Sequence, residues 1–189
     1  MTRTRSRSVD LHLDDLLPYL MNRLIARMNQ NLADALRERG FTFQDWRILA
    51  VLAAHEGANL TELAEASVIP QPSVSRLIAN LGRRGYVERR SVHSDSRVVR
   101  ILLTAKGRAV YRKMLPLALD EYRAATKGFS ATESEALRRA LLRMMENRKV
   151  RLLPQGASGS PARATAAAAA ATRRSAAGRS AAAAGSGRR

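Results

Sequence analysis

The sequence predicts a mainly α-helical fold with one small β-hairpin. Over most of residues 11–153, apolar residues recur at three- and four-residue steps, as in amphipathic helices, whereas residues 86–103 alternate as strands do. Residues 154–189 contain no acidic or aromatic residue and no Leu, Ile or Val, so they cannot bury enough apolar surface to offset the entropy of ordering. We therefore predict one folded unit at 11–153, between a disordered basic N-terminus at 1–10 and a disordered basic tail at 154–189, rich in Ala, Arg, Ser and Gly.

The first predicted helix spans residues 11–36 and is followed by Gly40, which ends it. Its apolar stripe consists of Leu13, Leu16, Leu17, Leu20, Leu24, Met28, Leu32, Ala35 and Leu36. Pro18 lies early in this stretch and predicts either a bend or a later start. Thr42 is predicted to cap a second helix that runs to about Ala54, with Phe41 and Trp46 placed to pack across its first turn.

Two further helices follow with a tight break between them. Asn59, with Glu62 three residues later, is a capping pattern that predicts a short helix at 60–65. The break falls at 67–70, and two prolines near its end suit the first turn of a helix, where a missing N–H does no harm. That helix is predicted to run from residue 71 to about 84.

The alternating segments at 86–90 and 98–103 predict two strands on either side of a polar tip at 91–97. Thr104 is predicted to cap a long helix through about Lys127, and Ser130 with Glu133 to open a last helix that extends to about Leu153. A short helix, a tight break, a second helix and then a hairpin form the order of a winged helix-turn-helix. We place this lobe at about residues 57–104.

The positive charge is concentrated in one block of the chain. Lys and Arg number 33 against 16 Asp and Glu, a net charge of +17 that favours a polyanionic partner, either nucleic acid or an anionic membrane surface. Within 11–153 the whole net excess falls at 76–113, whereas ordinary solvated helix faces would mix the two signs. No helix combines a basic face with a strongly apolar one, and the longest apolar run, 48–54, is far too short to span a bilayer. Nucleic acid is therefore the favoured partner.

The helix that begins near residue 71 is predicted to enter the major groove, which admits one helix whose first turns reach the base edges. Its expected DNA-binding residues are Gln71, Pro72, Ser73, Ser75 and Arg76. The hairpin tip presents His93, Ser94, Ser96 and Arg97, a thin cationic loop that suits the narrow minor groove. We expect phosphate contacts from Arg83, Arg84, Arg89 and Arg90.

Several short runs together resemble the multiple antibiotic resistance regulator (MarR) family. They are Leu60-Thr61-Glu62-Leu63-Ala64, Val74-Ser75-Arg76-Leu77-Ile78, Gly85-Tyr86-Val87-Glu88-Arg89, Asp95-Ser96-Arg97 and Leu103-Thr104-Ala105-Lys106-Gly107. The last two are similar to that family's wing signature, Asp-x-Arg followed by Leu-Thr-x-x-Gly. The likeness covers residues 11 to about 150 in order and length, and neither terminal extension belongs to the usual family pattern.

The resemblance implies a homodimeric transcription factor, usually a repressor, that binds double-stranded DNA at a pseudo-palindromic operator. It makes Arg97 the minor-groove residue of the wing and Asp95 the residue that orients the wing by pairing with a nearby arginine. It also implies dimerisation through the first and last helices, about 11–36 and 130–153. The alternative is that these long apolar-striped helices only complete the core of a monomer.

Many members of that family release DNA when a small, often aromatic, anion binds between the dimerisation helices and the DNA-binding lobe. The candidate ligand-binding residues here are His12, Tyr19, Arg23, Trp46, Arg47 and Tyr111. Arg or His can pair with a carboxylate, and Trp or Tyr can stack on a ring, so we expect an aromatic acid such as a hydroxylated benzoate or nicotinate. Each residue also has a plainer role: Trp46 in the core, Arg47 in an internal salt bridge, and His12 on the surface.

Other function classes find less support in the sequence. No nucleophile has a neighbouring base, and the three histidines are far apart without metal-ligand spacing, so we expect neither an enzyme nor a cofactor or metal. With no cysteine, thiol catalysis and cysteine redox sensing are excluded, and a reducing, cytoplasmic location is expected. A less specific architectural DNA-binding protein remains an alternative, because the arginines of the tail can add sequence-independent phosphate contacts. The tail's own alternative is an inert, solubilising extension.

Overall fold

The computed structural model describes residues 12–92 and 95–153, with the backbone alone at Val92 and at 95–98. In chain order the elements are a 3₁₀ turn η1 (Leu13–Asp15), helices α1 (Leu17–Arg37), α2 (Phe43–Ala54), α3 (Leu60–Ser67) and α4 (Gln71–Arg83), strands β1 (Val87–Val92) and β2 (Asp95–Leu103), and helices α5 (Ala105–Ala125) and α6 (Ala131–Asn147). The predicted fold class, mainly α with one hairpin, is confirmed. The predicted disordered segments at 1–10 and 154–189 lie outside the described residues.

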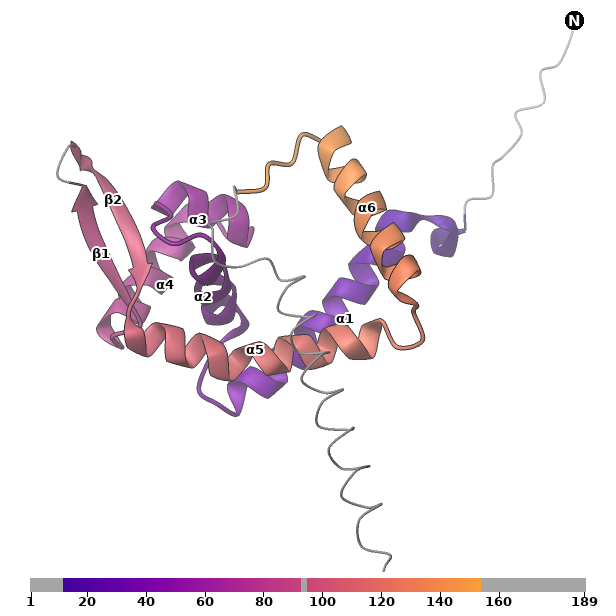
Figure 1. The fold of residues 1–189 in the computed structure, drawn as a ribbon, viewed down its shortest axis with the longest axis horizontal. Coiled ribbons are helices and arrows are strands. Elements are labelled where there is room, and N and C mark those ends of the chain that lie inside the picture. Colours follow the sequence, from indigo (N-terminus) through magenta and orange to yellow (C-terminus); the bar gives the residue numbers. More distant parts are fainter. Residues whose placement is uncertain (1–11, 93–94, 154–189) are drawn as a thin grey trace, which may run out of the picture.

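One hydrophobic core lies beneath the helix-turn-helix. It is formed by α2, α3, α4 and the hairpin, closed by the C-terminal half of α1 and the first half of α5 (Figure 1). Its most deeply buried side chains are Leu36, Ile48, Leu49, Leu52, Leu63, Val74, Ile78, Leu81 and Met114. Along the lower edge of Figure 1, α5 runs from the foot of the hairpin to the far side of the molecule, where α6 and the start of α1 lie. The core therefore holds the predicted DNA-binding lobe together but does not extend to α6.

Most helix starts follow the predicted capping chemistry. Reciprocal capping boxes open α2 (Thr42 with Asp45), α3 (Asn59 with Glu62) and α6 (Ser130 with Glu133). At α5 the Thr104 hydroxyl accepts a hydrogen bond from the Gly107 amide at 3.0 Å. Each of these side chains satisfies backbone N–H groups that have no partner within the helix, which is why the four predicted starts agree with the structure.

Three boundaries differ from the prediction. The first helix begins at Leu17 rather than at residue 11, after the separate turn η1, and Pro18 marks a late start, one of its two predicted roles. The strands are longer than expected and extend into the predicted tip, with Val92 opposite Asp95 and an irregularity between Ser91 and Val92. The last helix ends at Asn147 rather than near residue 153, because the chain turns at Lys149 with a φ of 55°.

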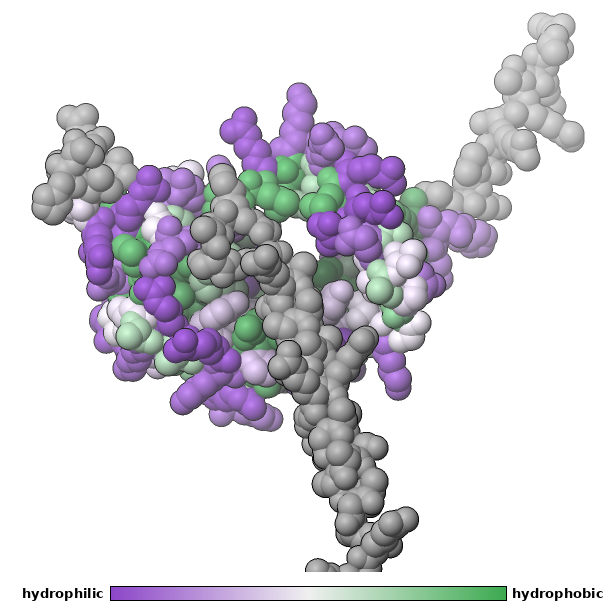
Figure 2. All heavy atoms as spheres, in the orientation of Figure 1, coloured by the Kyte–Doolittle hydropathy of each residue, from purple (hydrophilic) through white to green (hydrophobic). Residues whose placement is uncertain are grey.

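After this turn the chain crosses back towards the lobe (Figure 1). Leu153 lines a small hollow there together with Gly57 and Arg100. Figure 2 shows an opening through the molecule between α6 and the lobe. In the part of the chain that the structure describes, no helix has the length and apolar character needed to cross a membrane.

Candidate nucleic-acid interface

The helix α4 has one buried face and one face open to solvent. Val74, Ile78 and Leu81 are directed into the core. Of the predicted DNA-binding residues, Gln71, Pro72 and Arg76 are exposed, whereas Ser73 and Ser75 are half-buried. The apolar spacing that makes the helix amphipathic therefore also turns its polar side chains outward.

The turn between α3 and α4 fixes the angle of this outward face. Val68 ends α3 in the left-handed conformation, and the next residue, Ile69, is buried and donates its amide to the Ala64 carbonyl at 3.1 Å. Ser67 is buried as well, and its hydroxyl bonds to the Leu63 carbonyl. Because these groups are held by α3, the short connection carries α4 in one fixed orientation.

Several exposed cations lie on α4 and on strand β1, which packs against it. Arg76 and Arg83 on α4, and Arg89 on β1, are exposed, and within the described parts of the chain no carboxylate lies within ion-pair distance of them. Arg90 pairs with Glu88 at 2.6 Å, but the two side chains are 67% and 41% exposed and such solvent-exposed pairs are weak. These uncompensated charges suit contact with a polyanion.

Arg84, predicted to contact phosphate with its neighbours, lies differently. Its side chain is 30% exposed, and its guanidinium is held inside the lobe by the Asp45 carboxylate and the Gly40 carbonyl. The positions available for phosphate contact are therefore those of Arg83, Arg89 and Arg90.

The wing is described along its backbone. Asp95, Ser96 and Arg97 belong to β2, while their side chains, like His93 and Ser94 as a whole, lie outside the described residues. Below the tip, Arg100 donates to the Gly57 carbonyl at 3.1 Å and approaches Glu62 of α3 at 3.5 Å. This contact braces β2 against α3, a role for Arg100 that the sequence did not suggest.

The foot of the wing is held by the run Leu103 to Gly107. The Thr104 hydroxyl donates to the Gly85 carbonyl at 2.7 Å, and the Thr104 amide donates to Tyr86 at 3.1 Å. A Cβ atom added at Gly107 would overlap the Tyr86 carbonyl oxygen. The Leu-Thr-x-x-Gly pattern thus marks a close crossing of α5 and the start of β1.

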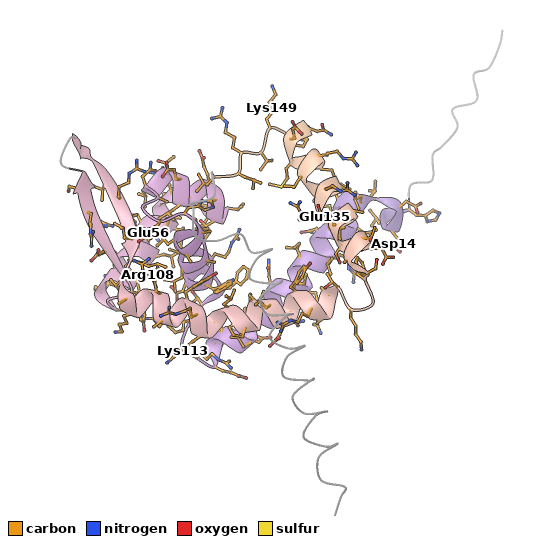
Figure 3. All side chains as sticks on the ribbon, viewed as in Figure 1. Asp14, Glu56, Arg108, Lys113, Glu135 and Lys149 are labelled. Carbon is orange, nitrogen blue, oxygen red and sulfur yellow. The ribbon has the colours of Figure 1, made fainter. Side chains whose placement is uncertain are left out.

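An ion pair joins α5 to the turn between α2 and α3. Arg108 of α5 lies 2.9 Å from Glu56 in the turn between α2 and α3 (Figure 3). Both side chains are about half exposed, so the pair contributes little to stability by itself.

The structure joins four of the six candidate ligand residues in two separate pairs, Trp46 with Tyr111 and Tyr19 with Arg23. Trp46 of α2 stacks on Tyr111 of α5, with ring centroids 5.5 Å apart and planes inclined by 9°. Trp46 also belongs to the core, and burial raises the pKa of the half-buried Tyr111 hydroxyl. Arg47 is half-buried over the Phe43 ring, and burial lowers its pKa. Among the described residues no carboxylate pairs with it, so the internal salt bridge considered for Arg47 is not formed there.

The other three candidates lie near the start of α1. Arg23 donates to the Tyr19 hydroxyl at 3.1 Å along the same helix, and His12 is exposed before η1. No described contact joins them to the Trp46–Tyr111 stack. The described residues also contain no group of three or more His, Asp or Glu arranged to hold a metal ion.

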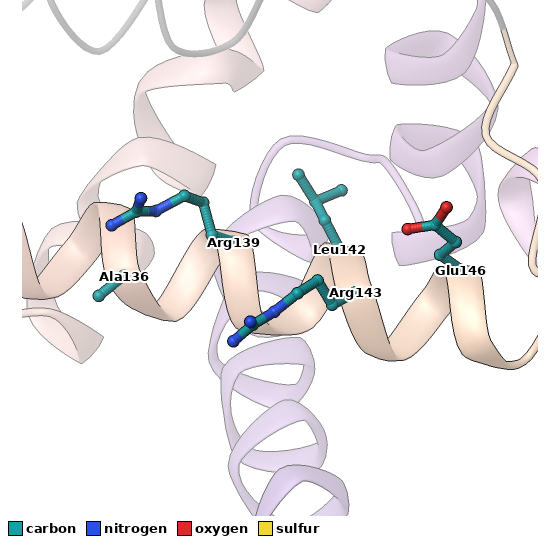
Figure 4. A pocket seen from close by; sticks show the side chains of 5 residues that line it. All are labelled: Ala136, Arg139, Leu142, Arg143 and Glu146. Atoms are coloured by element: carbon teal, nitrogen blue, oxygen red, sulfur yellow. The ribbon is translucent and has the colours of Figure 1, made fainter.

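Apolar surface is exposed on α1 and α6. On α1, Leu17, Leu20, Leu24 and Ile25 are each about half exposed, and no residue of α6 is buried. Green, hydrophobic atoms open to solvent are visible in Figure 2 where α6 ends and the chain turns back towards the lobe. The hollow of about 500 Å³ in Figure 4 is lined by residues of α6 alone, Ala136, Arg139, Leu142, Arg143 and Glu146. It is the uncovered face of one helix rather than an enclosed ligand cavity.

Comparison with known proteins agrees with this geometry. A family model for the MarR family matches residues 39–97. The homoprotocatechuate degradative operon repressor of Escherichia coli is 28% identical over 102 residues, which cover 54% of this chain and 69% of that protein. A MarR-family transcriptional regulator from Silicibacter pomeroyi is 30% identical with a TM-score of 0.71, over 78% of this chain and 99% of that one. Bordetella bronchiseptica BpsR, whose DNA binding is regulated by 6-hydroxynicotinic acid, has a TM-score of 0.62 at 23% identity, over 71% and 96% of the two chains, and shares the fold.

Proposed function

The chain belongs to the MarR family of DNA-binding transcriptional regulators, and from this premise we propose that it is a cytoplasmic homodimeric repressor of a pseudo-palindromic operator, released by a small aromatic acid. The observation that carries the proposal is the solvent face of α4. It presents Gln71 and Arg76 outward, and no carboxylate in the described residues neutralises Arg76, Arg83 or Arg89.

The homodimer is supported by the apolar surface that the single chain leaves uncovered. The start of α1 exposes four large apolar side chains, and α6 buries none of its own. Contiguous apolar surface of this kind marks an interaction site. A twofold arrangement of two copies would cover it and would place two α4 helices on the same side, as an inverted-repeat operator requires.

The ligand is supported by an aromatic pair and by a half-buried cation. The Trp46–Tyr111 stack offers aromatic surface, and Arg47, the next residue along α2, lies over the Phe43 ring and has no carboxylate partner among the described residues. A guanidinium near aromatic rings suits an aromatic carboxylate. The names of two similar proteins point the same way, since one is regulated by 6-hydroxynicotinic acid and the other represses a homoprotocatechuate degradative operon.

The proposed function is tested by a selection of genomic DNA fragments with the purified full-length chain at about physiological salt. We expect one inverted-repeat site with half-sites about one helical turn apart. Recovery without sequence preference, abolished by moderate salt, would contradict the proposal and favour the alternative architectural DNA-binding protein, whose binding would be dominated by phosphate contacts.

The ligand is tested through Trp46, the single tryptophan of the chain. Titration with 6-hydroxynicotinate and with hydroxylated benzoates should change its fluorescence, and the effective acid should weaken operator binding. Arg47→Gln should raise the Kd of that acid about tenfold, because it removes the charge that pairs with the carboxylate. If no acid alters Trp46 emission or operator binding, the ligand class is wrong, while the DNA-binding function stands.

A further inference from the structure

Arg84, the C-cap residue directly after α4, is held by the connection between α1 and α2, by the first turn of α2 and by Tyr86. Its Nη1 atom lies 3.4 Å from Asp45 Oδ2, and its Nη2 atom donates to the Gly40 carbonyl at 3.0 Å. Its guanidinium carbon lies 4.5 Å from the centroid of the Phe41 ring and 5.0 Å from that of Tyr86. The side chain therefore uses its charge, its hydrogen-bond donors and its planar faces within the lobe.

These partners belong to the connection between α1 and α2 and to the start of α2. Gly40 and Phe41 lie in the connection after α1, where their amides donate to the Arg37 and Leu36 carbonyls at the end of α1, and Asp45 lies in the first turn of α2. The Phe41 and Tyr86 rings lie 5.6 Å apart, centroid to centroid. Lys106 of α5 completes the cluster by donating to the Arg84 carbonyl at 2.9 Å, with its Nζ atom over Tyr86. One guanidinium thus joins the end of α4 to the connection that leaves α1 and to the first turn of α2.

The cluster depends on an arginine for a physical reason. Asp45 is 3% exposed, its Oδ2 atom accepts from the Thr42 amide and from Arg84, and its Oδ1 atom has no hydrogen-bond partner among the described residues. A buried carboxylate with so few partners relies on its counter-ion. A planar guanidinium can stack on rings and donate sideways at once, whereas a lysine ammonium cannot.

We propose that Arg84 is a positioning residue that fixes the orientation of α4 relative to α1 and so sets the half-site spacing that the dimer accepts. This inference rests on the proposed function, in which α1 belongs to the dimer interface and α4 enters the major groove. Half-site spacing is a geometric property of the distance and angle between two recognition helices. A looser junction between α4 and α1 widens the range of spacings that the two helices can reach.

The experiment compares full-length wild type with Arg84→Lys and Arg84→Gln on the selected operator and on copies with one base pair inserted or removed between half-sites. We expect both variants to bind the native spacing about tenfold or more weakly, and to discriminate at least about tenfold less between the native and altered spacings than wild type does. The slope of log Kd against log salt should stay at the wild-type value, because Arg84 neutralises no phosphate.

Arg83→Gln is the matched control, since the neighbouring Arg83 is exposed and unpaired among the described residues. It removes the same charge and should lower the salt slope by about 0.9 for each phosphate that it leaves without a cation, with the spacing preference unchanged. If Arg84→Gln behaves like Arg83→Gln, Arg84 binds phosphate and the proposal is overturned.

Circular dichroism and urea unfolding check that each variant folds. If an Arg84 variant does not fold, Phe41→Leu replaces it. This substitution removes one stacking ring and keeps the ion pair between Arg84 and Asp45. It should also relax the spacing preference. An unchanged spacing preference in every folded variant overturns the positioning role, even where stability falls. Failure of the wild type to select any spaced site would instead overturn the proposed function.

Discussion

Val68 occupies a backbone conformation that is costly for its side chain. It has a φ of 52° at the end of α3, and its side chain is 76% exposed, so little packing offsets the cost. For L-residues the left-handed region costs roughly 1–2 kcal/mol, and a branched Cβ is among the least suited to it. The turn that orients α4 therefore carries a local strain.

Replacing Val68 by asparagine should relieve this strain. Asparagine tolerates the left-handed region, so Val68→Asn should raise the free energy of unfolding by about 1 kcal/mol. Urea unfolding followed by circular dichroism measures the change. Val68→Thr, which keeps the branched Cβ, should give no such gain, and equal effects of the two substitutions would show that strain is not the cause.

Arg97 is the residue whose removal should most directly affect recognition by the wing. The family resemblance implies that it enters the minor groove, so Arg97→Ala should weaken operator binding by at least about 1 kcal/mol, against about 1–3 kcal/mol for a good specific contact. Anisotropy of a labelled operator measures the affinity. Arg123→Ala, at the exposed end of α5, removes the same charge and should have little effect. Unchanged affinity of the Arg97 variant would refute the role of Arg97 in the wing.

For single residues, the sequence shows which side chains could bind phosphate but not which of them the fold leaves free to do so. Arg83 and Arg84 are adjacent and chemically identical, so sequence patterns assigned both to phosphate. Arg84 turns inward because Asp45, Gly40 and the ring of Phe41 come from segments about 40 residues away, and no local pattern contains that information. Arg100 likewise braces β2 through a hydrogen bond to the Gly57 carbonyl, which lies 43 residues earlier in the chain.

Among the elements, α5 and β1 depend on one close crossing at Gly107. Its position in the first turn of α5 lies against the Tyr86 carbonyl, where a Cβ atom has no room. Gly107→Ala should therefore lower the free energy of unfolding by about 2 kcal/mol or more, because neither backbone segment can move without disturbing the core.

Gly82 provides the matched comparison. It is an exposed helical position in α4 whose added Cβ would meet the Val87 carbonyl oxygen at an ordinary 3.9 Å. Gly82→Ala should stabilise the fold by up to about 1 kcal/mol, since alanine favours the helix. Urea unfolding of both variants tests the pair, and a destabilisation of similar size in both would contradict the steric explanation.

Helix starts were predictable because their capping side chains lie within three residues of the groups they satisfy, as with Thr42, Asn59 and Ser130. The end of α6 was not predictable from the sequence. Apolar residues continue through Leu152 and Leu153 and extend the helical pattern, whereas the chain turns at Lys149, with the Val150 amide bonded to Met145 at 2.9 Å. A backbone turn of this kind leaves no mark in the hydrophobic spacing.

At the scale of the whole molecule, the positive charge of the tail adds to that of the lobe. Residues 154–189 carry six arginines and no acid, so we predict that they add sequence-independent phosphate contacts to those of the lobe. Deleting them should make the slope of log Kd against log salt shallower by about 0.9 for each phosphate that the tail neutralises, with the same preferred operator. Replacing the six arginines by glutamine in the full-length chain should reproduce the effect. An unchanged slope would make the tail an inert extension, and a shifted site preference would mean that it reads sequence.

The exposed face of α6 also has a consequence for how the chain gains its structure. In proteins most of the stability of a helix comes from packing of its apolar face, and no residue of α6 is fully buried within a single chain. In the proposed dimer its order would come from the partner copy, so the last step of folding and the assembly of two chains would be one event. The melting temperature should then rise with protein concentration, as mass action requires. In a newly synthesised chain at low concentration, the DNA-binding lobe would fold well before dimerisation places two lobes in the arrangement that the operator requires.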